Sequence, residues 1–116
     1  MNETQNTVAP EDFTQLTELH DMASHAVELL KAMANEWRLM ILCQLSEGEK
    51  TVTELQNILG LSQSALSQHL AVLRREKIVN ARKEAQSVYY SLAGEEATKV
   101  MESLHDVFCG AGKTTV

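Results

Sequence analysis

Apolar residues recur at helical spacing along most of this chain, a pattern that predicts a mainly α-helical protein. The first helix is expected over residues 11–33, where Pro10 suits the first turn and one face is apolar. That face holds Phe13, Leu16, Ala23, Ala26, Val27, Leu30 and Met33. Asn35 can cap a second helix. Its consecutive apolar residues, LMILC at 39–43, predict burial on nearly all sides, and SEGEK at 46–50 ends it.

The next two segments predict short helices joined by a tight turn. The third helix begins at Thr51 or Thr53 and ends before Gly60, which suits the left-handed conformation that closes many helices. A fourth helix is expected over residues 63–76, with Ser62 as its cap. The inner faces are Val52, Leu55 and Leu59 in the third helix, and Ala65, Leu66, Leu70 and Leu73 in the fourth. This arrangement is typical of a helix-turn-helix.

Beyond Glu76 the pattern changes to that of strands. The segments IVNARK at 78–83 and SVYYSL at 87–92 are rich in β-branched and aromatic residues, and the short EAQ connection predicts a hairpin. A last amphipathic helix follows and stops at CGAG, residues 109–112. Its apolar positions are Ala97, Val100, Met101, Leu104 and Phe108. The fold class is therefore mainly α with a small β-hairpin, in the order α-α-α-α-β-β-α.

The length of 116 residues predicts one domain, which we place at 10–109 between a disordered tail at 1–9 and a flexible tail at 110–116. Such a short chain buries a modest core, which favours a homodimer that shares one. We expect a cytoplasmic protein without membrane contact, because the sequence has neither a long apolar run nor a signal-peptide pattern. Two cysteines are too few for a disulfide framework.

Charge is distributed unevenly along the chain and points to DNA. The net charge is −6, yet residues 62–92 carry +3 and half of all Lys and Arg lie within 74–83. An acidic body with one basic segment can bind DNA through that segment. The surface of the fourth helix is polar at its start and basic at its end, as in a recognition helix. The candidate DNA-binding residues are Gln63, Ser64, Ser67, Gln68, His69, Arg74 and Arg75 on this helix, with Arg82 and Lys83 on the hairpin.

Two positions on the fourth helix need a separate interpretation. His69 lies beside the inner stripe of its helix, where packing with a hydrogen bond to a neighbouring element is expected. Ala71, on the outer surface of the same helix, is small enough to allow close approach to DNA. A solvated helix face without a partner is the simpler alternative for the whole surface. A steep loss of DNA affinity with salt would separate a DNA-binding protein from a winged-helix interaction module.

At these residues the chain resembles the ArsR-type winged-helix repressors, the arsenic-repressor superfamily. The similar segments are LLKAMANEWRLMILCQL, TVTELQNILGLSQSALSQHLAVLRREKIV and ARKEAQSVYYSL, and the resemblance spans residues 27–109. LSQSALSQHLAVLR, at 61–74, is its most specific part. The resemblance implies a winged helix-turn-helix that forms a homodimer through its first and last helices. Two recognition helices would then read a near-palindromic operator in double-stranded DNA.

Within this superfamily, the contexts of Cys43 and Cys109 resemble the dithiol sensors of persulfide and sulfide, which include the hemolysin-activator regulators of HlyU type. The resemblance implies redox sensing. A reactive sulfur species would modify one thiol, the other would attack to form a bridge, and operator affinity would fall. Burial alone would also account for Cys43, since free Cys packs as a small hydrophobe. The sequence leaves open whether the two cysteines meet.

Other chemistries remain as alternatives at this stage. The thiols could answer peroxide or a thiophilic metalloid, and the protein could activate transcription by displacing a silencing nucleoid protein. A metal site is not predicted: the third helix has no Cys, and the last helix offers His105 without a second His beside it. His20 and His25 are five residues apart and do not share a helix face. The chain also lacks Cys-x-x-Cys and a nucleophile with a matching base, so neither an enzyme nor a cofactor is predicted.

Overall fold

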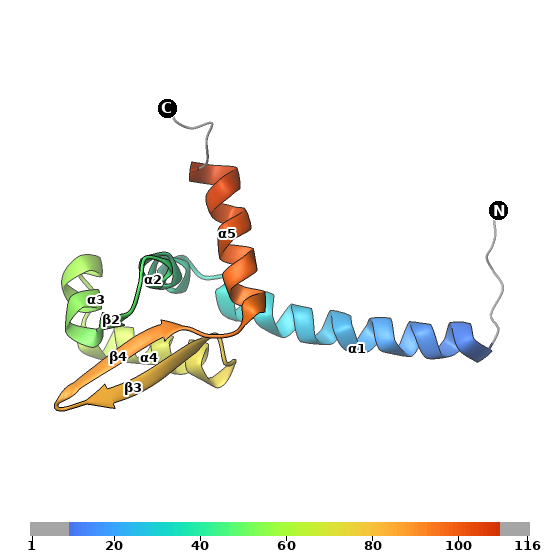
Figure 1. Ribbon diagram of the computed structural model, residues 1–116, viewed down its shortest axis with the longest axis horizontal. Coiled ribbons are helices and arrows are strands. Elements are labelled where there is room, and N and C mark those ends of the chain that lie inside the picture. The colour runs from blue at the N-terminus through green and yellow to red at the C-terminus, as the bar shows by residue number, and fades with distance from the viewer. Residues whose placement is uncertain (1–9, 110–116) are drawn as a thin grey trace.

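The structure is a computed structural model that describes residues 10–109, so both predicted tails lie outside the described residues. Helices dominate, with a small sheet at one side of the body (Figure 1). The elements in chain order are α1 (Pro10–Met33), α2 (Glu36–Ser46), β2 (Lys50–Thr51), α3 (Val52–Leu59), α4 (Gln63–Arg75), β3 (Val79–Glu84), β4 (Ser87–Leu92) and α5 (Glu95–Cys109). The predicted order is confirmed, with one short strand added.

Side-chain caps set the limits of the helices in the middle of the chain. The Asn35 side chain accepts a hydrogen bond from the Arg38 amide at 3.0 Å and begins α2. Thr51 and Glu54 form a reciprocal capping box at the start of α3. Gly60 ends that helix at φ +72°, the left-handed conformation predicted for it. Ser62 caps α4 through the Ala65 amide, so the helix-turn-helix lies where the sequence placed it.

The sheet has three antiparallel strands in the order β2-β4-β3. Glu84 pairs with Ser87, so the hairpin turn consists of residues 85 and 86 and is one residue shorter than the predicted EAQ connection. Strand β2 was not predicted from the sequence. It pairs with Tyr90 and Tyr89 of β4, and two residues are too few to show a strand period.

The core is enclosed by the end of α1, by α2, α3 and α4, by the hairpin of β3 and β4, which we call the wing, and by the start of α5. Its fully buried side chains include Leu55, Leu66 and Leu73, which hold α3 and α4 against α2. The prediction that the second helix is buried on nearly all sides is wrong. Met40 is 44% exposed and Cys43 is exposed, because at 100° per residue both lie opposite the buried face of α2.

Helix α1 projects from this body and buries only its C-terminal end, at Ala32 and Met33 (Figure 1). The apolar face predicted for it is largely open: Phe13 is 66% exposed and Leu30 is 53% exposed. The Cα radius of gyration is 18.7 Å, against about 13 Å for a compact domain of roughly 100 residues. No helix in the described range combines the length and apolarity needed to cross a membrane.

Candidate DNA-binding surface and dithiol groove

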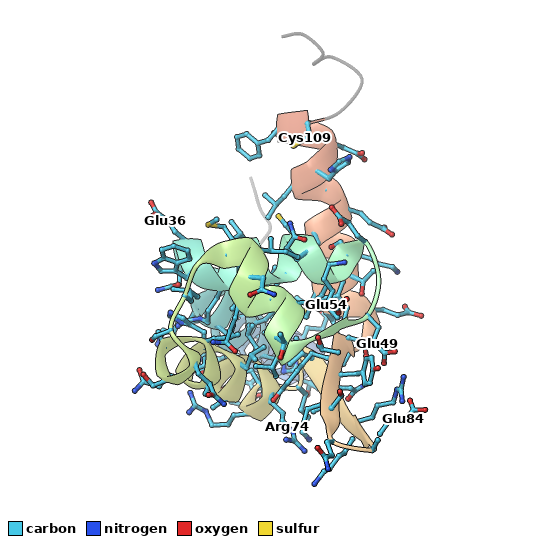
Figure 2. All side chains as sticks on the ribbon, turned by 90° about the vertical axis from the view of Figure 1, so that its left-hand side faces the viewer. Glu36, Glu49, Glu54, Arg74, Glu84 and Cys109 are labelled. Carbon is cyan, nitrogen blue, oxygen red and sulfur yellow. The ribbon has the colours of Figure 1, made fainter. Side chains whose placement is uncertain are left out.

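The outer face of α4 presents the polar side chains predicted to read DNA. Leu66, Leu70 and Leu73 face the core, and this orientation turns the opposite side of the helix to solvent. The exposed residues are Gln63, Ser64, Ser67, Gln68, Ala71, Arg74 and Arg75. Figure 2 shows Arg74 at the end of the molecule where the wing residue Glu84 also lies, far from Cys109 at the opposite end. A single duplex could therefore meet α4 and the wing together.

His69 differs from the other candidates on α4. Its side chain is half-buried, and its pKa is lowered first by burial and then by the positive charge of Arg38. The Arg38 guanidinium in turn donates to the Ala32 carbonyl at 2.5 Å, at the junction of α1 and α2. The half-buried imidazole lies beside this junction, whereas the hydrogen bond to a neighbouring element expected for His69 is not found within residues 10–109.

The two basic residues of the wing have different surroundings. Arg82 Nε and Nη2 donate to the two carboxylate oxygens of Glu49 at 2.9 and 2.8 Å, and Nη1 donates to Glu84 at 2.6 Å. Its guanidinium also lies 4.6 Å from the Tyr89 ring centroid. Lys83 is exposed and has no ion pair within residues 10–109. The sequence did not predict a role for Glu49, because its hydrogen-bond partner Arg82 is 33 residues away in the chain.

Hydrogen bonding to Glu49 is the main reason that the pKa of Arg82 is raised, and the same bond lowers the pKa of Glu49. On α4, Arg75 lies 3.6 Å from the carboxylate of Glu76, whereas Arg74 forms no ion pair in the described part of the chain. A cavity of about 370 Å³ adjoins this end of α4, and Tyr90 of β4 lines it together with Arg74. Among the basic residues predicted to bind DNA, Arg74 and Lys83 are therefore the two without an ion pair in the described part of the chain.

Cys43 and Cys109 line the same groove, of about 600 Å³, between α2 and α5. Both are free thiols and both are exposed. The pKa of Cys43 is raised, first by burial against the groove wall and then by the negative charges of Cys109 and Glu47. Because both cysteines line this one groove, their side chains border a shared space. The structure thus brings together two cysteines that are 66 residues apart in the sequence.

The groove is apolar with an acidic rim. Leu39, Met101, Leu104 and Phe108 supply its apolar wall, and Glu47, Glu102 and Asp106 supply carboxylates; Ser46 and His105 complete it. The residues that line the groove include no lysine or arginine whose positive charge would favour a thiolate. Helical spacing could have found part of this set, because Glu47 follows Cys43 by one turn and His105 precedes Cys109 by one turn.

Metal ligands do not cluster in the described residues: no group of three His, Cys, Asp or Glu side chains is placed to hold an ion. His20 and His25 do not form a site. His25 lies 3.8 Å from the Glu96 carboxylate and links α1 to the start of α5. Cys43 and Cys109 are the two thiols in the lining of the groove.

Comparisons with known proteins identify similar chains. The model of a bacterial regulatory protein family, the arsR family, matches residues 35–81. The transcriptional activator HlyU of Vibrio cholerae is 54% identical over 98 residues, which cover 84% of this chain and 91% of that protein.

Solved structures of similar proteins have the same fold as this chain. Reduced HlyU from Vibrio cholerae superimposes with a TM-score of 0.77 at 55% identity, covering 79% of this chain and 97% of that one. A homodimeric winged helix-turn-helix DNA-binding domain from Mycobacterium bovis gives a TM-score of 0.70 at 30% identity, covering 76% and 82%.

Proposed function

This chain belongs to the ArsR family of bacterial transcriptional regulators, and we propose that a sulfur bridge between Cys43 and Cys109 makes it release its operator. The observation that carries the proposal is the shared groove, in which both free thiols lie on facing helices. The reduced protein would bind DNA in the cytoplasm, where thiols stay reduced until an oxidant arrives.

The DNA-binding form that we propose is a homodimer. The open apolar face of α1 and the exposed Val107 and Phe108 of α5 would be covered by a second copy of the chain. A twofold dimer would present two α4 helices to successive major grooves, so the operator would be near-palindromic with half-sites about one turn apart. The polar face of α4 would contact base edges, and Arg74 and Lys83 would contact phosphates.

The bridge forms in two steps. A Cys109 thiolate attacks the sulfane sulfur of a persulfide RSSH, forms Cys109–S–SH and releases RS⁻. The Cys43 thiolate then attacks Sγ of Cys109, forms the disulfide and expels hydrosulfide. The two thiols together lose two electrons and two protons, which leave with the sulfur as hydrogen sulfide while the carrier leaves as RSH. We assign the first attack to Cys109 and the second to Cys43, whose raised pKa lowers its own thiolate fraction.

A longer bridge follows if a second persulfide reacts. Two thiols and two RSSH then give a trisulfide, two RSH and one molecule of hydrogen sulfide. A peroxide would yield only the disulfide, with water as the reduced product. A retained sulfur atom in intact-protein mass spectrometry therefore identifies a persulfide response, whereas a plain disulfide is the product of either oxidant.

The bridge would act on DNA binding through α5. It ties α2, which packs in the DNA-reading body, to a helix proposed to lie at the dimer interface. A change in the angle or spacing of the two subunits moves both recognition helices off their half-sites. A difference of about 3 kcal/mol between reduced and bridged protein would lower operator affinity roughly a hundredfold.

The test compares operator binding before and after treatment with a persulfide, for the natural protein and for Cys43→Ser and Cys109→Ser. We expect release only in the natural protein. The reduced forms of both variants serve as controls, since serine should leave the DNA-binding surface intact. Release that persists in both variants would refute the proposal.

A further inference from the structure

Backbone pairing between β2 and β4 joins the wing to the body, and the Arg82 side chain adds a second link. Arg82 on β3 holds both oxygens of Glu49, which lies between α2 and β2, and also holds Glu84 on its own strand. We call this set of contacts, Arg82 with Glu49, Glu84 and the Tyr89 ring, the wing clamp. Figure 2 shows Glu49 and Glu84 on the same side of the molecule. A bidentate pair with a third donor and ring stacking is a geometry that single surface ion pairs seldom have.

The clamp leaves Arg82 poorly suited to bind a phosphate. Three of its nitrogens already donate to carboxylate oxygens, and the Tyr89 ring covers part of the guanidinium. A phosphate at this point would also meet two negative charges, Glu49 and Glu84. Lys83 is next in the chain, exposed and without an ion pair in the described range. The wing therefore has one cation engaged in structure and one available to DNA.

The body end of the clamp adjoins the dithiol groove. Ser46 and Glu47, at the end of α2, line that groove with Cys43. Glu49 follows Glu47 by two residues, and Lys50 then pairs with Tyr90 of the wing. Lys50 is also 3.8 Å from Glu47. Residues 46–51 thus contact the groove at one end and the wing at the other.

We propose that Arg82 is a positioning residue that orients the wing, not a DNA contact, and that the wing clamp transmits a bridge in the groove to the wing. The first part stands independently of the redox chemistry. The second part rests on the proposed function. A bridge that shifts the end of α2 would move Glu49, and the wing would move with it through Arg82.

The first experiment measures operator affinity of the reduced protein for Glu49→Gln and its matched control Glu84→Gln. Each removes one negative charge beside Arg82, but of these two carboxylates only that of Glu49 lies outside the wing. We expect Glu49→Gln to weaken binding about threefold to fivefold and Glu84→Gln to leave it unchanged or up to about twofold tighter. Tighter binding by both variants would identify Arg82 as a DNA contact and overturn the proposal.

Three further variants separate the bidentate geometry of Arg82 from its charge. Arg82→Lys keeps the charge and loses the bidentate geometry, so we expect a loss of affinity like that of Glu49→Gln. Lys83→Gln should lower the slope of log affinity against log salt by about 1, whereas Arg82→Gln should leave the slope unchanged. Natural affinity in Arg82→Lys, or an equal drop in slope for Arg82→Gln, would contradict a positioning role. Thermal unfolding of each variant distinguishes loss of wing position from loss of fold.

The second experiment measures the ratio of reduced to bridged operator affinity, with bridge formation confirmed by mass spectrometry. If the natural protein shows about a hundredfold ratio, Glu49→Gln should reduce it to about twentyfold, and adding Arg82→Lys should reduce it no further. An unchanged ratio in a fully bridged Glu49→Gln protein would refute only the second part of this proposal, transmission through the wing clamp. A ratio of one in the bridged natural protein would refute the proposed function and this transmission together, and the positioning role would still be decided by the first experiment.

Discussion

Replacing Leu30 by alanine on the open face of α1 should weaken the proposed homodimer about 10- to 100-fold. Full burial of a leucine side chain is worth roughly 1.5–3 kcal/mol. Leu30 is 53% exposed in the single chain, so a partner could bury about half of it. Twofold symmetry counts the change twice, which gives roughly 1.5–3 kcal/mol per dimer. Alanine favours helix at least as well as leucine, so α1 itself should persist.

Analytical ultracentrifugation over a dilution series measures the dimer dissociation constant directly. Ile58→Ala on α3 is the matched control, because Ile58 is 50% exposed but lies on neither proposed dimer helix. Operator affinity should fall with dimerisation in Leu30→Ala and not in Ile58→Ala. A dissociation constant that is unchanged by Leu30→Ala but raised by Ile58→Ala would refute the assignment of the interface to α1.

Three other predictions concern stability and reactivity. The lowered pKa of His69 means that the unfolded chain binds a proton more readily, so the free energy of unfolding should fall as pH drops below about 6.5. His69→Gln should remove the contribution of His69 to this fall in the free energy of unfolding, measured by urea titrations at pH 7.5 and 5.5. An identical pH dependence in the natural protein and the variant would contradict the lowered pKa of His69. Thr51→Ala should lower the free energy of unfolding by about 1 kcal/mol through loss of the α3 capping box, and no change in the urea midpoint would contradict the role of the cap. Cys43 should react with iodoacetamide more slowly at pH 7.5 in folded protein than in urea, by peptide mass spectrometry; equal rates would argue against the raised pKa.

Much of the fold could be predicted because its signals are local. Asn35, Thr51 and Ser62 cap helices through amides three residues ahead, and Gly60 ends one through its own backbone conformation. The inner leucines of α4 follow from helical period alone, and they determine which polar side chains face outward. The outward-facing surface of α4 was thus available from the sequence, residue by residue.

Features that join distant segments were decided only by the tertiary structure. The sequence suggested Cys43 as core filler or sensor, and only the packing of α5 against α2 placed it in one groove with Cys109. The role of Arg82 likewise depends on Glu49, 33 residues away. Strand β2 exists only because Tyr90 is there to pair with it.

The difference between local signals and long-range contacts also explains the open face of α1. The sequence predicted the helical period of its apolar residues but could not predict whether that face is buried. Periodicity and capping involve neighbours within about four residues, so one chain segment contains the whole signal. Burial, pKa shifts and thiol pairing depend on which segments meet in space, and that is set by the packing of the folded chain.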